Sequence, residues 1–319
     1  MSESYKRMKE IRSADYVRFL SLRKSIRIDG KLIPLGRRAQ IAEWGPPEQY
    51  EHEAYTVWSF PDRGEWATHN GGYRGNWSPY IPRNLISRFT KAGDWVLDPM
   101  MGGGTTLVES KILGRNVIGI DVNLNAVMLA RDRLAFRVPK ATRTGTVETK
   151  TYLGDARQLN KIPDEGIDLI ATHPPYAGII RYGDGMIEGD LSRISSFQGY
   201  TEGMGAVAKE CYRVLKRGRH CGVLIGDTRR HRHFVPISLA VLSEFLRVGF
   251  VLLEDIIKIQ HNTTSDRGRW KGRRQDFYKI AHEHLFIFRK PESEAERREL
   301  VLSGARILGA GQTSSMSER

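Results

Sequence analysis

The stretch VLDPMMGGGTT, residues 96–106, decides the fold class. Its apolar start runs into Pro99, and a proline cannot continue inside a central strand, so a buried strand is expected to end there. Three glycines follow, and TTLVESKILG then predicts a helix with Gly114 as its C-cap. A strand, a glycine turn and a helix in direct succession predict the opening unit of an α/β fold.

Strands and helices alternate through the rest of the chain. Besides the strand at 94–100, strands are predicted at 116–122, 151–157, 167–173, 220–227, 251–260 and 283–290. Further helices are predicted at 125–136, 203–218 and 237–250. This alternation predicts a doubly wound, mostly parallel seven-stranded sheet.

The two ends of the chain differ from this central region. Residues 1–75 are rich in Lys and Arg, and we expect a basic N-terminal accessory segment with one helix and a short extended piece. The Trp-, Gly- and Arg-rich residues 55–89 fit either a binding loop or a loop packed into the core. Residues 76–291 form the main predicted domain, and residues 292–319 predict a short helix and a disordered tail.

Charge and composition narrow the function classes. The 319 residues carry a formal net charge of +13, which favours a polyanionic partner such as nucleic acid, with a merely basic surface as the alternative. Only two cysteines are present, so neither a disulfide framework nor a cysteine-based zinc site is expected, and a reducing cytoplasm is the predicted location. The N-terminus lacks the apolar region of a signal peptide, and no apolar run approaches the roughly 18 residues of a membrane span.

The three glycines predict a cofactor site at the carboxyl ends of the strands, although a glycine run can also be only a tight turn. The dinucleotide pattern G-x-G-x-x-G is not met, because Leu107 stands where its last glycine would be, and no Gly-Lys-Ser/Thr phosphate loop is present. Asp121 ends the second strand, where it can accept from two ribose hydroxyls or cap the next helix. Asp155 ends the third strand and could accept from an adenine amino group.

These segments together resemble the amino-group DNA methyltransferases that use S-adenosylmethionine. VLDPMMGGGTT is similar to the family's cofactor loop, Asp-Pro-Phe-x-Gly-x-Gly-Thr-Thr, and IGIDVN at 118–123 to its ribose-binding strand. THPPYAGIIRYGD at 172–184 resembles the catalytic Ser/Asn/Asp-Pro-Pro-Tyr loop. GNWSPYIPRNLISRF at 75–89 stands where the family has the helix and loop that close over methionine. The resemblance covers about residues 90–290 and implies a class I, Rossmann-like methyltransferase domain.

The resemblance also implies the site residues. For the cofactor, S-adenosyl-L-methionine, they are Asp98, Pro99, Met101, Gly102, Gly104, Thr105, Thr106, Asp121, Val122, Asp155 and Ala156. For catalysis they are His173, Pro174, Pro175 and Tyr176. Two residues depart from the family pattern, since Met100 replaces a phenylalanine and His173 replaces Ser, Asn or Asp.

The catalytic loop fits methyl transfer to an exocyclic amino group. The lone pair of such a group is delocalised into the ring, so two acceptors aimed at its hydrogens would free the lone pair for the methyl carbon. A neutral His173 has one acceptor nitrogen; alternatively His173 packs away and the Pro174 carbonyl is the main acceptor. Tyr176 is expected to stack on a base that has been flipped out of the duplex. Neither cysteine follows a proline, which argues against cytosine C5 chemistry. Thr-x-Pro-Pro-Tyr resembles the Thr-Ser-Pro-Pro-Tyr of the N4 enzymes, and this resemblance implies cytosine N4 over adenine N6.

Two basic clusters are candidates for nucleic-acid contact. In the loop at 260–279, cationic residues surround a tryptophan, which suits phosphate contact and base stacking, or else a solvated hairpin tip: Arg267, Arg269, Trp270, Lys271, Arg273 and Arg274. DTRRHRHF at 227–234 is the second cluster. Its His231 and His233 lack acidic or cysteine partners at a useful spacing, so no metal is expected.

The predicted partner is therefore DNA, double-stranded with a flipped base, with no membrane and no metal, and the resemblance leaves room for a cognate restriction nuclease. Two rival functions remain open. One is a tRNA guanine-N2 methyltransferase, since those enzymes resemble this family and use Asp-Pro-Pro-Tyr. The other is a non-catalytic nucleic-acid-binding protein with a degenerate methyltransferase fold, which His173 would suggest.

Overall fold

The computed structural model describes residues 8–28, 30–36, 40–71, 76–139, 146–176, 187, 189–194, 196–261 and 277–304. All seven predicted strands are present: β5 (Trp95–Asp98), β6 (Asn116–Asp121), β7 (Thr149–Leu153), β8 (Ile167–Thr172), β9 (Leu215–Ile225), β12 (Val251–Ile259) and β13 (His282–Arg289). They lie in the order β7-β6-β5-β8-β9-β13-β12, and only β13 among them runs antiparallel to its neighbours. The predicted doubly wound, mostly parallel sheet is confirmed.

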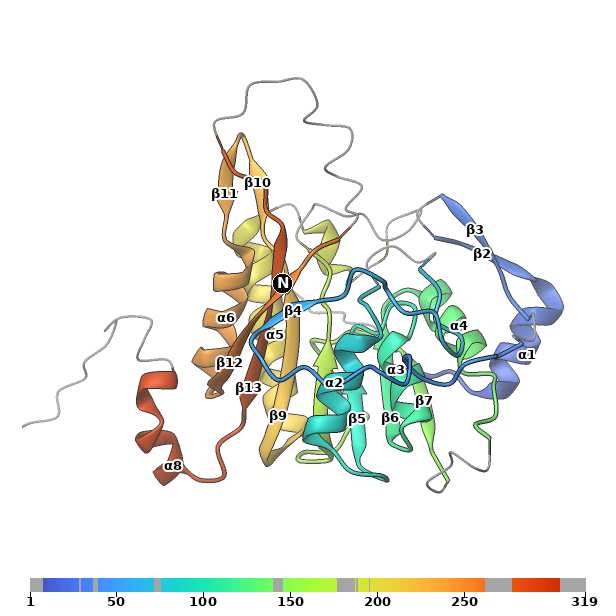
Figure 1. The fold of residues 1–319 in the computed structure, drawn as a ribbon, viewed down its shortest axis with the longest axis horizontal. Helices are drawn as coiled ribbons and strands as arrows, with labels where there is room; N and C mark the ends of the chain where they lie inside the picture. The colour runs from blue at the N-terminus through green and yellow to red at the C-terminus, as the bar shows by residue number, and fades with distance from the viewer. Residues whose placement is uncertain are drawn as a thin grey trace, which may run out of the picture.

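Helices cover both faces of this sheet (Figure 1). On one face lie α2 (Tyr80–Phe89), α3 (Thr105–Ile112) and α4 (Leu124–Arg133), and on the other α5 (Phe197–Val214) and α6 (Ile237–Val248). Successive residues of a strand point to opposite faces. Leu169 of β8 accordingly packs with the first group and Ile170 with the second, and both are fully buried. The central strands are mostly apolar because both faces are covered.

The N-terminal residues extend the sheet at both edges. β1 (Lys9–Glu10) pairs antiparallel with β7, and β4 (Val57–Ser59) pairs parallel with β12, so the sheet has nine strands among the described residues. Between them lie α1 (Ser13–Leu22) and the hairpin of β2 (Ser25–Ile28) and β3 (Lys31–Pro34), in agreement with the predicted helix and extended piece. The physical reason for the two extra strands is that an uncovered edge leaves backbone N–H and C=O groups unpaired. Two strands of this segment are therefore built into the main sheet, while β2 and β3 form a separate two-stranded sheet.

The Trp- and Arg-rich residues 55–89 pack largely into the core. Trp66 is 3% exposed, and its indole nitrogen donates to Glu109 Oε1 at 2.6 Å. Glu109 lies on α3, is fully buried, and also contacts His69 at 2.7 Å and Arg83 at 2.9 Å. Since a buried carboxylate needs such partners, Glu109 holds this segment against the helix that follows the glycine loop. The core-packed interpretation describes this part of the segment.

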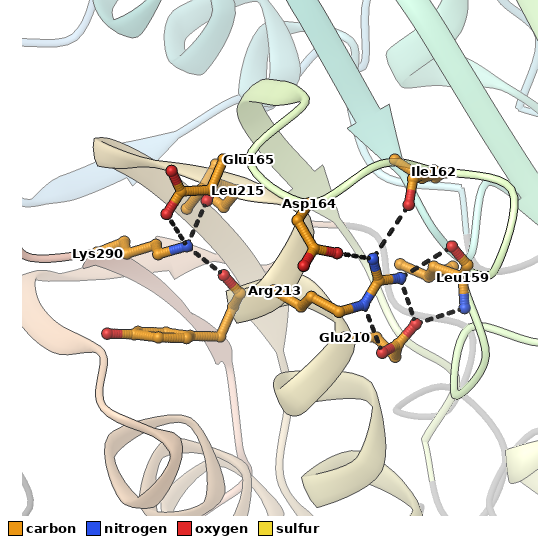
Figure 2. A network of polar contacts seen from close by, with 9 residues as sticks. Leu159, Ile162, Asp164, Glu165, Glu210, Arg213, Leu215 and Lys290 are labelled. Atoms are coloured by element: carbon orange, nitrogen blue, oxygen red, sulfur yellow. Dashed lines mark hydrogen bonds and ion pairs between the residues drawn. The ribbon is translucent and has the colours of Figure 1, made fainter.

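A second polar network stabilises the sheet at the amino ends of β8 and β9 (Figure 2). Arg213, in the last turn of α5, donates to Glu210, to Asp164 and to the carbonyls of Leu159 and Ile162. Its partners raise the pKa of the Arg213 guanidinium, so it stays charged. This network fixes the connection between β7 and β8, and Lys290 ties the end of β13 to the same region by donating to the Leu215 carbonyl at 2.7 Å.

A small hairpin follows β9. Its strands are β10 (Thr228–Arg230) and β11 (His233–Val235), and it projects beyond the end of the sheet (Figure 1). Elsewhere, η2 (Leu191–Arg193) precedes α5, while α8 (Glu294–Glu299) and η3 (Val301–Ser303) follow β13 and include the predicted C-terminal helix; residues 305–319 lie outside the described part. Among the described residues, no helix has both the length and the apolar character to cross a membrane.

Candidate active site

The strand order reverses between β5 and β8. The chain passes from β5 outward to β6 and β7 on one side, and from β8 to β9 on the other. Ligands of open α/β sheets bind at the carboxyl ends of strands at such a switch point. A cavity of about 790 Å³, including its open mouth, lies there. Its lining comes from the ends of β5, β6, β7 and β8, and from segments beside α2 and η2.

The glycine loop has steric requirements that explain two of its residues. Gly104 takes a left-handed φ of +82° and is the N-cap of α3. At Gly103, a Cβ atom would lie 2.4 Å from the Arg133 guanidinium, which donates to the Gly103 carbonyl at 2.8 Å. The loop is thus a compact turn that packs against α4 on one side and opens to the cavity at Gly102 on the other.

Asp121 is fixed at the end of β6 by two backbone donors. Its carboxylate accepts from the Asn123 N–H at 2.8 Å and from the Gly102 N–H at 3.0 Å. Burial raises the pKa of Asp121 to about 7, although these two hydrogen bonds oppose the rise. The cap of α4 is Asn123, whose side chain accepts from the Asn125 N–H. Asp121 is therefore not the cap, and its carboxylate lines the cavity.

Asp98 joins the two halves of the site. One carboxylate oxygen accepts from the Thr106 hydroxyl at 2.6 Å and the other from the Thr172 hydroxyl at 2.9 Å. Thr106 belongs to α3 after the glycine loop, and Thr172 is the residue before His173. Burial raises the pKa of Asp98 to about 6, and the two hydroxyls and the Met100 N–H oppose the rise.

Asp155, at the turn after β7, also lines the cavity. Its carboxylate forms an ion pair with Arg157 at 2.6 Å and accepts from the Arg157 N–H at 2.9 Å. Arg157 also donates to the Gly189 carbonyl, and a Cβ atom at Gly189 would lie 2.6 Å from the Asp155 carboxylate. The segment before η2 thus closes over Asp155, which narrows this end of the cavity.

The loop predicted to be catalytic reaches the cavity through His173 and Pro175. The His173 ring lies against Trp77, with centroids 6.1 Å apart and planes inclined by 28°. Tyr200 of α5 donates to the Pro175 carbonyl at 2.9 Å. Tyr176 differs from the expectation that it faces a base, because its ring is buried and its hydroxyl lies 2.9 Å from His173 Nε2 and 2.5 Å from Glu283. A glycine at 226 leaves room for this inward position.

The structure brings most of the predicted site residues together. Those that line the cavity are Asp98, Pro99, Met101, Gly102, Thr105, Asp121, Val122, Asp155, Ala156, His173 and Pro175. The predicted residues that stand behind this lining are Gly104, Thr106, Pro174 and Tyr176. The six residues predicted to contact nucleic acid, between Arg267 and Arg274, lie outside the described part of the chain.

Other residues of the lining were not singled out from the sequence. They are Asn76, Trp77, Met100, Asn123, Gly154, Gly189, Asp190 and Leu191. The position of the segment 75–89 just before the first strand was the available signal for Asn76 and Trp77. No local signal marks Asp190, which reaches the cavity as the N-cap of η2.

The lining fits an adenosine-type cofactor. The Asp121 carboxylate lines the cavity at a strand end, where such a group can accept from a pair of ribose hydroxyls. Among the described residues, the Thr105 hydroxyl at the N-terminus of α3 is buried without a hydrogen-bond partner, and it lines the same cavity. A buried polar atom in this state needs an outside partner. Within the described residues, no group of three or more His, Cys, Asp or Glu side chains is arranged to hold a metal ion.

The fold and this site define a class I methyltransferase whose cofactor is S-adenosylmethionine. A family model described as DNA methylase matches residues 2–132 and 167–308. The chain belongs to this family, the N6/N4 DNA methylases.

Individual relatives are similar over shorter stretches. A tRNA (guanine(10)-N2)-dimethyltransferase of Methanothermobacter thermautotrophicus is 34% identical over 105 residues, 33% of this chain and 29% of that protein. The Type II methyltransferase M2.DpnII of Streptococcus pneumoniae is 47% identical over 55 residues, 17% of this chain and 20% of that protein. The matches thus span less than a third of either relative. A SAM-dependent methyltransferase structure from Methanosarcina mazei has a TM-score of 0.44 and 17% identity, covering 66% of this chain and 98% of that chain.

Proposed function

We propose that this protein is a site-specific DNA methyltransferase that moves a methyl group from S-adenosylmethionine to an exocyclic amino group, with cytosine N4 favoured over adenine N6. The observation that carries the proposal is the continuity of one cavity. Asp121 lies at the cofactor end, and His173 and Pro175 line the same space. A methyl group on the cofactor and the target amino group could therefore meet in this cavity without any movement of the sheet.

The cofactor supplies an electrophilic methyl group on a positively charged sulfur, so the protein needs no nucleophile of its own. Its residues act by positioning, which can lower a barrier greatly when the reacting atoms are aligned. Thr172 is held by Asp98, and two prolines restrict the backbone that follows it. The Pro175 carbonyl is already bonded to Tyr200. His173, which lines the cavity, is therefore the acceptor that we assign to the target amino group.

Nucleic acid would approach from the carboxyl edge of the sheet. The hairpin of β10 and β11 leaves β9 at this edge, because β9 runs parallel to β8. Its exposed tip carries Arg230, His231, Arg232 and His233. With the net charge of +13, these residues suit phosphate contacts. A double-stranded substrate would have to present its target base flipped out of the stack.

A second candidate is a tRNA guanine-N2 methyltransferase, and the observation that favours it is the similarity to the tRNA dimethyltransferase given above. The same basic surface serves either nucleic acid.

Two further predictions belong to the DNA enzyme: a location in the cytoplasm and a cognate restriction nuclease. Cys211 and Cys221 are both free thiols in the core, which agrees with a reducing compartment.

The test offers the full chain labelled S-adenosylmethionine with unmethylated genomic DNA and bulk tRNA in parallel reactions. The product nucleosides are then identified by mass spectrometry, with His173→Ala as the matched control for background transfer. N4-methylcytosine in DNA is the expected product. N6-methyladenine in DNA would change the assigned base from cytosine to adenine and leave DNA as the assigned substrate. Label in tRNA alone would transfer the assignment to the RNA enzyme. Cofactor binding with no label in either would refute both proposals.

A further inference from the structure

A buried chain of hydrogen bonds, which we call the relay, connects His173 through Tyr176 and Glu283 to Lys258. The Tyr176 hydroxyl is 2.9 Å from His173 Nε2 and 2.5 Å from Glu283 Oε1. The other oxygen of Glu283 accepts from Lys258 Nζ at 3.0 Å. Glu283 and Lys258 are cross-strand partners on β13 and β12, more than 80 residues from the catalytic loop in sequence. Glu283 is 7% exposed, so its contacts are shielded from water.

Glu283 is ionised in this setting. Burial by itself would raise the pKa of its carboxyl, but the charge of Lys258 and the hydrogen bonds from Tyr176 and Lys258 are among the contacts that lower the pKa below its usual value. An ionised carboxylate accepts hydrogen bonds and donates none. The short contact between Tyr176 and Glu283 is therefore donated by the tyrosine.

Counting hydrogens fixes the next bond. A tyrosine hydroxyl has one hydrogen, and that of Tyr176 is committed to Glu283. Toward His173, the Tyr176 oxygen can only accept, so the hydrogen of that contact resides on His173 Nε2. A neutral imidazole with its hydrogen on Nε2 carries its acceptor lone pair on Nδ1.

We infer that Tyr176, Glu283 and Lys258 are positioning residues that hold His173 in the Nε2–H tautomer, so that Nδ1, which is buried in this structure, is the ring nitrogen left to accept from the target amino group. The acceptor role rests on the proposed function, whereas the tautomer does not. A carbonyl or carboxylate oxygen carries no hydrogen and can always accept, but a histidine accepts only at its unprotonated nitrogen. The relay leaves His173 with one defined acceptor nitrogen. The Ser, Asn or Asp at this position of similar enzymes has an acceptor oxygen that needs no such relay.

The inference makes a directional prediction for Glu283→Gln. Lys258 is only a donor, so the glutamine carbonyl is expected to turn toward Lys258 and its NH₂ toward Tyr176. Tyr176 then accepts from Gln and donates to His173 Nε2, which inverts the tautomer to Nδ1–H. Tyr176→Phe removes the relay and should give a mixture of tautomers. Tyr16→Phe is the matched control, because that hydroxyl also donates to a carboxylate, Asp132, outside the site.

The measurement is nitrogen NMR of the full chain labelled with ¹⁵N-histidine at neutral pH, with the signals of His173 identified by their loss in His173→Asn. The expected tautomers are Nε2–H in the wild type and in Tyr16→Phe, Nδ1–H in Glu283→Gln and a mixture in Tyr176→Phe. An imidazolium or an Nδ1–H tautomer in the wild type would overturn the inference. The Nε2–H tautomer in both Glu283→Gln and Tyr176→Phe would also overturn the inference. None of these readings requires a nucleic-acid substrate, so failure here is distinguishable from failure of the proposed function.

A kinetic cycle adds a second readout. Tyr176→Phe should lower kcat about tenfold, the order expected for one lost buried hydrogen bond, with the cofactor Kd unchanged. Asparagine in place of His173 has a carbonyl acceptor that needs no tautomer, so in the His173→Asn background the same tyrosine change should have little further effect. An equal loss in both backgrounds would show that Tyr176 acts on the substrate directly and would contradict the relay.

Discussion

Asp121→Asn tests the assignment of the cofactor site most directly. The carboxylate already accepts from the N–H groups of Gly102 and Asn123, and we assign its remaining lone pairs to two ribose hydroxyls. An asparagine has one acceptor oxygen, and its NH₂ would face a donor. A hydrogen bond to a charged group contributes about 1.5–3 kcal/mol, so the loss of one such bond weakens cofactor binding about 10- to 150-fold.

The wild type should also bind the cofactor in a pH-dependent way. The pKa of Asp121 is raised to about 7 by burial, and ribose hydroxyls donate better to the ionised form. Affinity should therefore increase as the pH rises through 7 and level off above it. With this pKa, about a tenth of Asp121 is ionised at pH 6 and about nine tenths at pH 8, so Kd should fall about tenfold between these values.

The assay is isothermal titration calorimetry with S-adenosylhomocysteine or S-adenosylmethionine at pH 6, 7 and 8, on the wild type and Asp121→Asn. Asp98, whose pKa is about 6, and the ligand's own amino group titrate in both proteins, so the difference between them isolates Asp121. An unchanged Kd in the variant would refute the ribose assignment. A pH dependence that persists equally in the variant would refute its origin in this carboxyl.

Three further predictions follow from the packing and the charge. Gly226→Ala places a Cβ atom 3.0 Å from the Tyr176 hydroxyl, so kcat should fall while the cofactor Kd stays the same, and an unaffected kcat would contradict the importance of the ring position. Glu109→Ala leaves three donors around an empty buried site, and urea denaturation should show a loss of about 3–5 kcal/mol in the free energy of unfolding; a loss under about 1 kcal/mol would mean that the cluster does not hold the segment. Replacement of Arg230 and Arg232 by Glu should weaken nucleic-acid binding and reduce the salt dependence of log Kd by about 1–2, whereas an identical salt slope would exclude the hairpin from the interface.

The sheet and most of the cavity were predictable because their signals are local. Most predicted strands are short apolar runs bounded by turn residues, and most of the predicted site residues that line the cavity follow directly after such a run. β1 and β4 were not predicted, since two or three residues are too few to show a period of two. Their pairing is set by the free edges of the sheet and not by their own sequence.

The contacts that support the site could not be predicted in the same way. Glu109 stands within the helix sequence TTLVESKI, where a glutamate would ordinarily face solvent, and it is fully buried because the segment before α2 returns over that face. Glu283 begins an apolar strand, which is typical of an exposed strand end. Its place behind Tyr176 depends on the insertion of β13 between β9 and β12, and local periodicity carries no information on strand order.

The Asp98 carboxylate has a consequence for how such an enzyme can change its target. Its two oxygens accept hydrogen bonds from Thr106, which follows the glycine loop, and from Thr172, which precedes His173. A single side chain therefore fixes the position of the glycine loop relative to the loop that carries His173. Alignment errors therefore do not accumulate through a long chain of contacts before they reach the reacting atoms. If the proposed function holds, we expect the β10–β11 hairpin to tolerate exchange for that of a relative, because it is remote from Asp98 and the transfer step would not have to change with it.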